Sequence, residues 1–313
     1  MTNGSWWAVA LSESVSGTKP LAVVCNGQEL VVYRDAAGDL FALEDRCPHR
    51  RVPLSLGTVK RGGLQCGYHG WTFDGATGAC LEIPNLHADE RVPARYGARA
   101  FRVAEHNGFV HVWLGEGSPD GELPAAASKP GGREFTGSAI VSISYDDYLG
   151  VMLDGPECLL GFDGVRITDF FLGDPRVEGT DLVLERGAVW KTAMLPPAFV
   201  TDHPLIVRTA VPLAGGMIRV DLLGADETQV VSIRIATSAN RRGTTGICWR
   251  GFKNGNALPA APLRWRVARA AGRAPFALRE KIDGAAIAAL LVAPSRDLAA
   301  ARAERATPMG AAA

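Results

Sequence analysis

Two Cys/His pairs constrain this chain more than any other feature of its sequence. Cys47 and His49 are separated by one residue, Cys66 and His69 by two, and sixteen residues lie between the pairs. Thiolate and imidazole ligands suit iron–sulfur clusters and zinc. Closed zinc sites usually place like ligands together, as C-x2–4-C followed by H-x3–5-H, whereas each pair here contains one of each kind. The pattern therefore favours a two-iron cluster with both thiolates on one iron and both imidazoles on the other.

The residues around these pairs resemble a known signature. The stretch CPHR…CGYHGWTFDGATG is similar to the Rieske signature of the ring-hydroxylating and demethylating oxygenases, and the similarity continues past the pairs through residues 71–78. The alternative is a zinc knuckle or two separate structural pairs, which the mixed spacing disfavours. The ligands of a [2Fe–2S] cluster that the resemblance implies are Cys47, His49, Cys66 and His69.

The length of 313 residues predicts two domains. A Gly-, Pro- and Ala-rich stretch after the first third indicates a linker. The last residues are rich in Ala and Arg without an apolar stripe, so we expect a tail without stable structure. The predicted boundaries are 1–115 for a Rieske domain, 116–134 for the linker, 135–294 for an oxygenase-like domain and 295–313 for the tail.

The predicted fold class is α+β. Many short β-favouring runs with Gly-rich turns in the first third predict a small all-β sandwich or barrel. The second domain alternates strand candidates, from 138–145 to 230–236, with helical patterns at 148–160 and 263–291. One long C-terminal helix against an antiparallel sheet is a known layer arrangement. The resemblance implies that this domain has the helix-grip (START-like) fold.

Bulk composition excludes several classes of protein. The formal net charge is zero, so we expect no binding to nucleic acid. No run reaches about 18 apolar residues and no secretory signal is visible, so we expect no membrane span and a cytoplasmic protein. Six cysteines are few for this length. Those outside the two pairs are expected to be buried free thiols in a reducing compartment, namely Cys25, Cys80, Cys158 and Cys248.

The resemblance also implies a mononuclear Fe(II), held in the second domain by two histidines and one carboxylate. The family's motif D-x-x-H-x-x-x-x-H places its aspartate on Asp154 and its histidines on Glu157 and Phe162, and the last carboxylate falls at Asp283. A phenylalanine cannot bind a metal. Of the six histidines, only His203 follows the linker. We therefore expect no mononuclear Fe(II) in this chain.

Each of these positions has a plain structural interpretation as well. The sequence from Asp154 to Glu157 contains Gly-Pro, which ends a helix because proline lacks a backbone donor. His203 lies in a turn-like sequence and Asp283 beside an apolar helical face, so both are expected on the surface. Four arginines within 264–273 suggest a solvated helix face or, alternatively, a docking surface for an acidic redox partner.

Asp154 has a further possible role. In the family, the matching aspartate hydrogen-bonds across a subunit boundary and links a cluster histidine of one chain to an iron ligand of the next. We expect Asp154 to keep the cluster half of this inter-subunit bridge, although Glu157 has replaced the iron half. Such outer carboxylates orient a ligating imidazole and tune its basicity.

Three functions remain open. The leading one is an electron-transfer, non-catalytic subunit of an oxygenase system, which takes electrons from a reductase or ferredoxin and works with a catalytic Rieske oxygenase paralogue in a trimeric or hexameric hetero-oligomer. The second is an active hydroxylase or demethylase of a small organic molecule with an atypical iron site at Glu157, Asp283 and His203. The third is a ligand-binding or scaffold protein with a redox-sensing cluster.

Overall fold

The computed structural model describes residues 4–60, 63–87, 90–117, 119, 123, 132–162, 165–190, 204–213, 216–254, 276–278 and 295–306. The chain forms two compact units. The first unit contains Met1–Ala127 together with two later segments, Ser138–Ser142 and Ala236–Cys248, and the second unit contains the rest. The first unit thus runs past the predicted boundary at 115 to Ala127, and it includes two segments of the predicted second domain.

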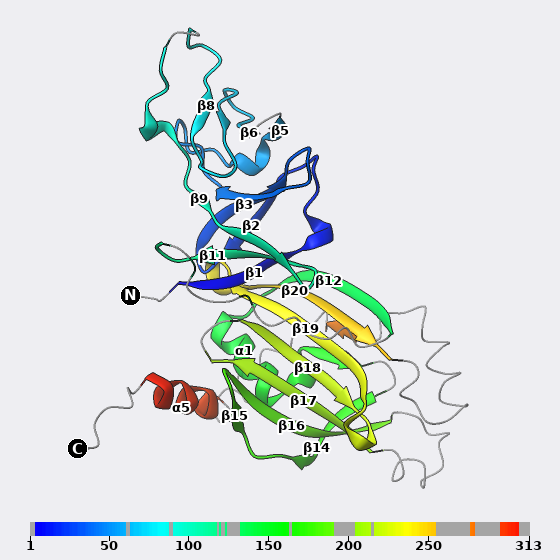
Figure 1. The fold of residues 1–313 in the computed structure, drawn as a ribbon. Coiled ribbons are helices and arrows are strands. Elements are labelled where there is room, and N and C mark those ends of the chain that lie inside the picture. The colour runs from blue at the N-terminus through cyan, green and yellow to red at the C-terminus, as the bar shows by residue number, and fades with distance from the viewer. Residues whose placement is uncertain are drawn as a thin grey trace, which may run out of the picture. The chain divides into compact units, whose positions relative to one another are not determined.

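The first unit consists of three small antiparallel sheets, drawn in blue to cyan in Figure 1. The first sheet has the order β1 (Ser5–Leu11), β11 (Phe109–Leu114), β10 (Val103–His106). The second has the order β2 (Leu21–Cys25), β3 (Gln28–Arg34), β4 (Leu40–Glu44), β9 (Ala100–Phe101). The third has the order β5 (Thr58–Lys60), β6 (Gly63–Gln65), β7 (Thr72–Phe73), β8 (Cys80–Glu82). The prediction of a small all-β domain agrees with this arrangement.

The turns of this unit follow from local chemistry. Between β3 and β4, one carboxylate oxygen of Asp35 accepts the backbone N–H groups of Ala37 and Asp39, each at 2.9 Å. Such a carboxylate takes the place of backbone partners and closes the hairpin between these two strands. Successive side chains of β11 point to opposite faces of the sheet. Val110 and Val112 share one face and pack with Leu30 in a buried apolar cluster.

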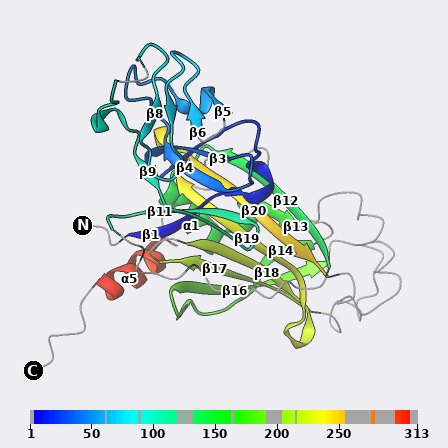
Figure 2. The same cartoon turned by 45° about the horizontal axis from the view of Figure 1, so that its top comes forward.

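Most of an eight-stranded sheet belongs to the second unit, where it curls around helix α1 (Tyr145–Asp154), as Figures 1 and 2 show. The strand order is β12 (Arg133–Val141), β20 (Thr245–Lys253), β19 (Gln229–Ala239), β18 (Met217–Leu223), β17 (Leu205–Pro212), β16 (Asp181–Trp190), β14 (Val165–Leu172), and β15 (Arg176–Glu178) also pairs with β16. Helix α1 packs against β16 and β17. Ser144 caps its N-terminus by accepting the Asp147 N–H, as serine commonly does.

Glycines explain why the β12–β20 region differs from its prediction. Strand β12 begins at Arg133, inside the predicted linker, and β20 was not predicted. Glycines lower strand propensity, but here each leaves room for an aromatic ring: a Cβ at Gly137 would collide with Trp249, and one at Gly251 with Phe135. The packing of these rings between the two strands compensates for the low strand propensity of glycine. This packing cannot be recognised from either segment of the sequence alone.

The C-terminal predictions need correction. Residues 276–278, within the expected long helix 263–291, form strand β21 (Phe276–Leu278), which pairs with β13 (Leu160–Phe162). The remainder of that range lies outside the described residues, so the long helix is not confirmed. The expected unstructured tail contains helix α5 (Ser295–Ala306). Leu298 and Ala301, one turn apart, are buried, and this short apolar stripe was missed in the sequence.

Two general features complete the fold. The six cysteines all lie in described parts of the chain and form no disulfide, and Cys25 and Cys248 are buried whereas Cys80 and Cys158 are half-buried. Among the helices that the structure describes, none is long and apolar enough to span a bilayer.

Candidate metal centre

The two Cys/His pairs lie on loops that share one backbone arrangement. Each cysteine carbonyl accepts the N–H of the residue four positions later, from Arg51 to Cys47 at 2.8 Å and from Gly70 to Cys66 at 3.1 Å. Each cysteine N–H also donates to the carbonyl five positions later, at 2.9 and 2.8 Å. The residue four positions after each cysteine has a left-handed backbone conformation, with φ of 59° at Arg51 and 72° at Gly70. The loops are therefore equivalent, although their histidines are spaced differently.

Glycines allow these loops to touch. A Cβ at Gly57 would collide with the Gln65 carbonyl oxygen, and a Cβ at Gly67 would lie 2.8 Å from the carbonyl oxygen of Leu56. Real Cβ atoms do not approach backbone this closely, so only glycine fits at both positions. The contact brings the segment that follows the first pair against the segment that carries the second.

A buried carboxylate fixes the ends of the first loop. Asp45, which is 9% exposed, accepts the backbone N–H of Ser55 and the Ser55 hydroxyl, both at 2.7 Å. Charge-assisted hydrogen bonds of this kind are stronger than neutral ones. They close the segment that contains Cys47 and His49 into one rigid unit.

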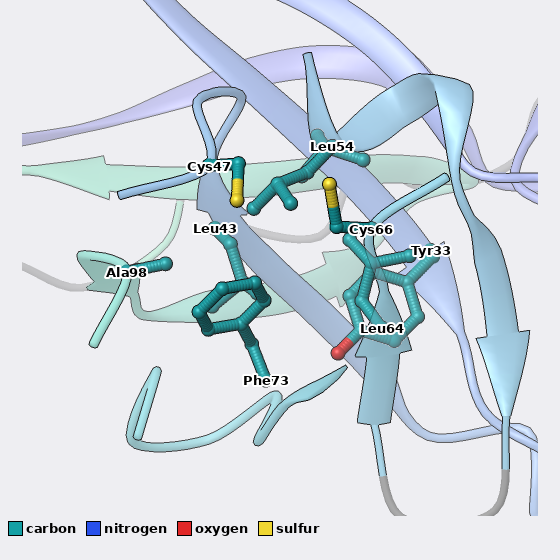
Figure 3. Packing of buried hydrophobic residues seen from close by; sticks show 9 residues of the cluster. Tyr33, Leu43, Cys47, Leu54, Leu64, Cys66, Phe73 and Ala98 are labelled. Atoms are coloured by element: carbon teal, nitrogen blue, oxygen red, sulfur yellow. The ribbon is translucent and has the colours of Figure 1, made fainter. Parts of the chain in front are cut away.

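The two thiols share a buried, apolar site. Cys47 and Cys66 are 2% and 3% exposed and belong to one core cluster with Leu54, Leu64 and Phe73. Figure 3 shows both sulfur-bearing side chains beside Leu54. Burial raises the pKa of the Cys47 thiol, and the neighbouring Cys66 raises it further, against a backbone hydrogen bond from His49. Two thiolates can coexist here only beside a strong positive charge, which a bound metal supplies.

The two imidazoles meet at the surface. Their rings are 4.7 Å apart, and the Nδ1 atoms of His49 and His69 face each other at 3.1 Å. Nitrogens this close fit two bonds of about 2 Å to one metal ion. His49 lies parallel to Trp71 at 4.7 Å, and Tyr68 lies against His69 at 3.9 Å. A buried sulfur pair and an exposed nitrogen pair fit a two-iron cluster better than a single ion.

Comparison with known proteins decides between the candidate centres. Residues 5–102 match the protein family described as the Rieske [2Fe-2S] domain. Residues 5–102 form a Rieske [2Fe–2S] domain. Its cofactor is a [2Fe–2S] cluster, and the zinc alternative is thereby set aside.

Relatives of this Rieske domain occur in several oxygenase systems. A putative toluene-4-sulfonate monooxygenase system iron-sulfur subunit, TsaM2 of Comamonas testosteroni, is 38% identical over 116 residues, 37% of this chain and 32% of the relative. The 4beta-methylsterol monooxygenase of Methylococcus capsulatus is 40% identical over 141 residues, 43% of this chain and 37% of the relative. The matches thus span about a third of the length of these relatives.

The fold similarity extends beyond the Rieske domain. The crystal structure of dicamba monooxygenase bound to dicamba superposes with a TM-score of 0.64, covering 97% of this chain and 90% of that chain at 20% sequence identity. At this identity the likeness concerns the fold alone. The relatives and structural neighbours of the chain thus include several oxygenases, and the chain has the fold of dicamba monooxygenase.

The positions of the second, mononuclear site lie partly within the structure. Asp154 ends α1, Glu157 follows in a short 3-10 turn after Gly155-Pro156, and Phe162 is a buried residue of β13. The helix therefore breaks where the Gly-Pro sequence predicts. Asp283 and His203 lie outside the described residues. In the part of the chain that the structure describes, no three His, Cys, Asp or Glu side chains converge on one point, and the four residues of the Cys/His pairs meet as a buried Cys pair and an exposed His pair.

A basic residue beside Asp154 was missed in the sequence. Arg186 of β16 is 5% exposed and donates from Nη2 to the Leu153 carbonyl at 3.5 Å, at the C-terminal end of α1. Burial raises the pKa of the Asp154 carboxyl to about 7, with Arg186 lowering it and Asp297 of α5 raising it. The packing of β16, α1 and α5 brings Arg186, Asp154 and Asp297 near one another, and the linear sequence does not reveal this packing.

Proposed function

We propose that this chain is the electron-transfer, non-catalytic subunit of an oxygenase system, and that Cys47, His49, Cys66 and His69 are its cluster ligands. When bound, a [2Fe–2S] cluster with two imidazole ligands supplies one-electron transfer at a potential above that of plant-type ferredoxins. The chain's own residues hold the thiolates in a dry core and present the imidazoles at the surface. That geometry supports electron exchange with another protein.

One observation carries the non-catalytic part of the proposal. Phe162, at the second histidine position of the iron motif, is 4% exposed and pairs in a strand with Phe276. A side chain without a donor atom, packed in the fold, leaves the motif without that ligand. Electrons would then pass to a catalytic Rieske oxygenase paralogue in a trimeric or hexameric hetero-oligomer, with a reductase or ferredoxin as the donor.

Asp154 supports contact with such a paralogue. Its Oδ2 atom is buried and has no hydrogen-bond partner in the described structure, a costly state for a carboxylate. We propose that it accepts a hydrogen bond from a cluster imidazole of a neighbouring subunit. The Asp154→Asn variant should then show a changed reduction potential of the cluster in the assembled complex, and an unchanged potential would refute this bridge.

A second candidate function rests on Glu157. Its Oε2 atom, like the Asp154 carboxylate, is buried without a hydrogen-bond partner in the described residues. An atypical iron site with Glu157, Asp283 and His203 as ligands would use it, and the protein would then be an active oxygenase. The third candidate, a scaffold or ligand-binding protein with a redox-sensing cluster, has no specific observation in its favour.

Oxygen consumption by the isolated protein separates these functions. With its cluster chemically reduced, the purified chain should oxidise no added aromatic or sterol compound at a rate above that of buffer. Consumption of O₂ that depends on an added compound would refute the non-catalytic function and support the atypical iron site.

A further inference from the structure

Helix α5 contacts helix α1 and runs along it in the opposite direction. Arg302, in the second half of α5, donates from Nη1 to Oδ1 of Asp146 at 2.9 Å, and Asp146 lies in the first turn of α1. Asp297 lies in the first turn of α5 and acts on Asp154, the last residue of α1. Contacts at both ends thus make α5 a strap along α1.

The two ends of the strap differ in the sign of their interaction. At one end Arg302 is attracted to Asp146, and its Nε also donates to the Leu213 carbonyl, just after β17, at 3.2 Å. At the other end two carboxylates face each other. Burial raises the pKa of the Asp154 carboxyl, and the negative charge of Asp297 raises it further. The strap is therefore attached at its second half and repelled at its start.

Little apolar surface holds α5 in place. Within 297–303, only Leu298 and Ala301 are buried. The side chains of Arg302 and Asp146 are 32% and 74% exposed, and ion pairs of such exposure contribute little stability. An isolated helix of twelve residues is also marginal in water. We therefore expect α5 to leave α1 by local unfolding more readily than the sheet unfolds.

The position of α5 bears on a carboxylate that has an unmet need. Oδ2 of Asp154 is buried and has no hydrogen-bond partner in the described structure. Asp297, whose charge acts on Asp154, is followed directly by the buried Leu298. The start of α5 is thus packed against the second unit close to this carboxylate, and its departure would let water or another donor reach Oδ2.

We propose that α5 is an autoinhibitory strap, which shields Asp154 while it lies on α1 and exposes this carboxylate when it leaves. The inference rests on the proposed function, in which Asp154 accepts a hydrogen bond from an imidazole of a neighbouring subunit. The bound strap blocks that acceptor, and the released strap makes it accessible.

Hydrogen exchange of the full chain, followed by mass spectrometry in peptides that contain 295–306, measures the release of α5. Arg302→Ala removes the attractive end, so exchange of these peptides should be about tenfold faster. Asp154→Asn removes the repulsion and should slow it about threefold. Arg241→Ala is the matched control, since it removes an exposed ion pair with Glu29 in the first unit, and it should stay within about twofold of the wild type.

Labelling of carboxylates measures the exposure of Asp154 itself. A carbodiimide with glycine ethyl ester modifies accessible carboxylates in the full chain. In Arg302→Ala, modification of Asp154 should be about tenfold faster than in the wild type, in step with the exchange of α5. Asp45, a buried carboxylate of the first unit, is the internal reference and should stay protected in every variant.

Three results would overturn the strap. One is exchange of 295–306 at the wild-type rate in Arg302→Ala or in Asp154→Asn, and another is faster exchange of α5 without faster modification of Asp154. The third is an equal gain of modification at Asp154 and Asp45, which would show unfolding of the whole chain. An unchanged reduction potential of Asp154→Asn in the assembled complex would refute the subunit bridge alone, and it would leave the exchange and labelling results valid.

Discussion

The imidazole of His49 and the indole of Trp71 lie parallel, with their ring centroids 4.7 Å apart and 5° between their planes. The same indole contacts Tyr96, so the orientation of His49 depends on a column of rings rather than on its own loop alone. A proposed cluster ligand is thus fixed by aromatic packing from a segment that follows it by more than twenty residues.

Replacing Trp71 with leucine tests this orientation. Stacked aromatic pairs contribute about 0.5–1.5 kcal/mol beyond the area that they bury. Trp71→Leu should therefore lower the unfolding free energy by at least that amount and change the g-anisotropy of the reduced Rieske EPR signal. Phe171→Leu, in which an exposed ring of β14 is lost, serves as the control. Identical EPR spectra of Trp71→Leu and the wild type would show that the stack does not orient His49.

Close contact between the cluster loops predicts strict requirements for glycine. Gly57→Ala and Gly67→Ala place a methyl group against backbone carbonyls, and overpacking of this kind costs about 1–3 kcal/mol. Both variants should melt earlier and retain less iron after purification. Gly161→Ala is the matched control, since a Cβ at Gly161 meets no atom within 4 Å. Equal iron content in all three proteins would contradict the account of the loop contact.

The buried carboxylate of Asp45 predicts a specific role for Ser55. In Ser55→Ala one carboxylate oxygen loses its hydroxyl donor inside the protein, which costs about 1–3 kcal/mol. Chemical denaturation should show a lower unfolding free energy, whereas Ser16→Ala, which removes an exposed hydroxyl, should leave it within about 0.5 kcal/mol. A larger loss in the Ser16 variant would show that Asp45 does not stabilise the first loop.

Stability should depend on pH through His111. The pKa of this imidazole is lowered to about 4, mainly by burial and to a lesser extent by His106, against a backbone hydrogen bond at Phe109 that raises it. Because the unfolded chain has a pKa near 6.5, the stabilisation is complete above about pH 6.5 and is lost as the pH falls through about 4. The wild type should lose about 3 kcal/mol more than His111→Gln between these values.

The control for this pH dependence is His87→Gln, in which an exposed histidine is replaced. Urea unfolding of the three proteins at pH 7 and pH 4.5 measures the difference. The His87 variant should follow the wild type. If His111→Gln lost as much unfolding free energy between pH 7 and pH 4.5 as the wild type, other groups would be the cause of the acid sensitivity.

The sequence predicted the parts of the fold that local chemistry determines. The sequence predicts strands at Leu21–Cys25, Leu40–Glu44, Phe109–Leu114 and Met217–Leu223, and these are the bounds of β2, β4, β11 and β18. Short β-favouring runs and the turn residues beside them define these strands within a few positions. The Rieske domain was predicted from ligand types whose chemistry can be recognised in a linear chain. The choice of [2Fe–2S] over zinc is confirmed, whereas the assignment of the four ligands stays a prediction.

Features that depend on distant residues could not be predicted in the same way. Arg51 adopts a left-handed conformation that glycine usually takes, and only its equivalence with Gly70 across the two loops explains it. Arg186 comes beside Asp154 through the packing of β16 against α1. Arg95 contacts Tyr96, whose ring packs on Trp71 beside His49, although Arg95 lies far along the chain from His49. Tertiary contacts, rather than propensities, determine each of these.

The central claim is that this chain carries a Rieske cluster and no mononuclear iron of its own. Quantitative iron and sulfide analysis of the anaerobically purified protein, combined with EPR of the reduced sample, tests it most directly. The account predicts two iron and two sulfide ions per chain with a Rieske signal of matching intensity. A third iron ion per chain whose spectrum changes on addition of a small organic substrate would contradict it.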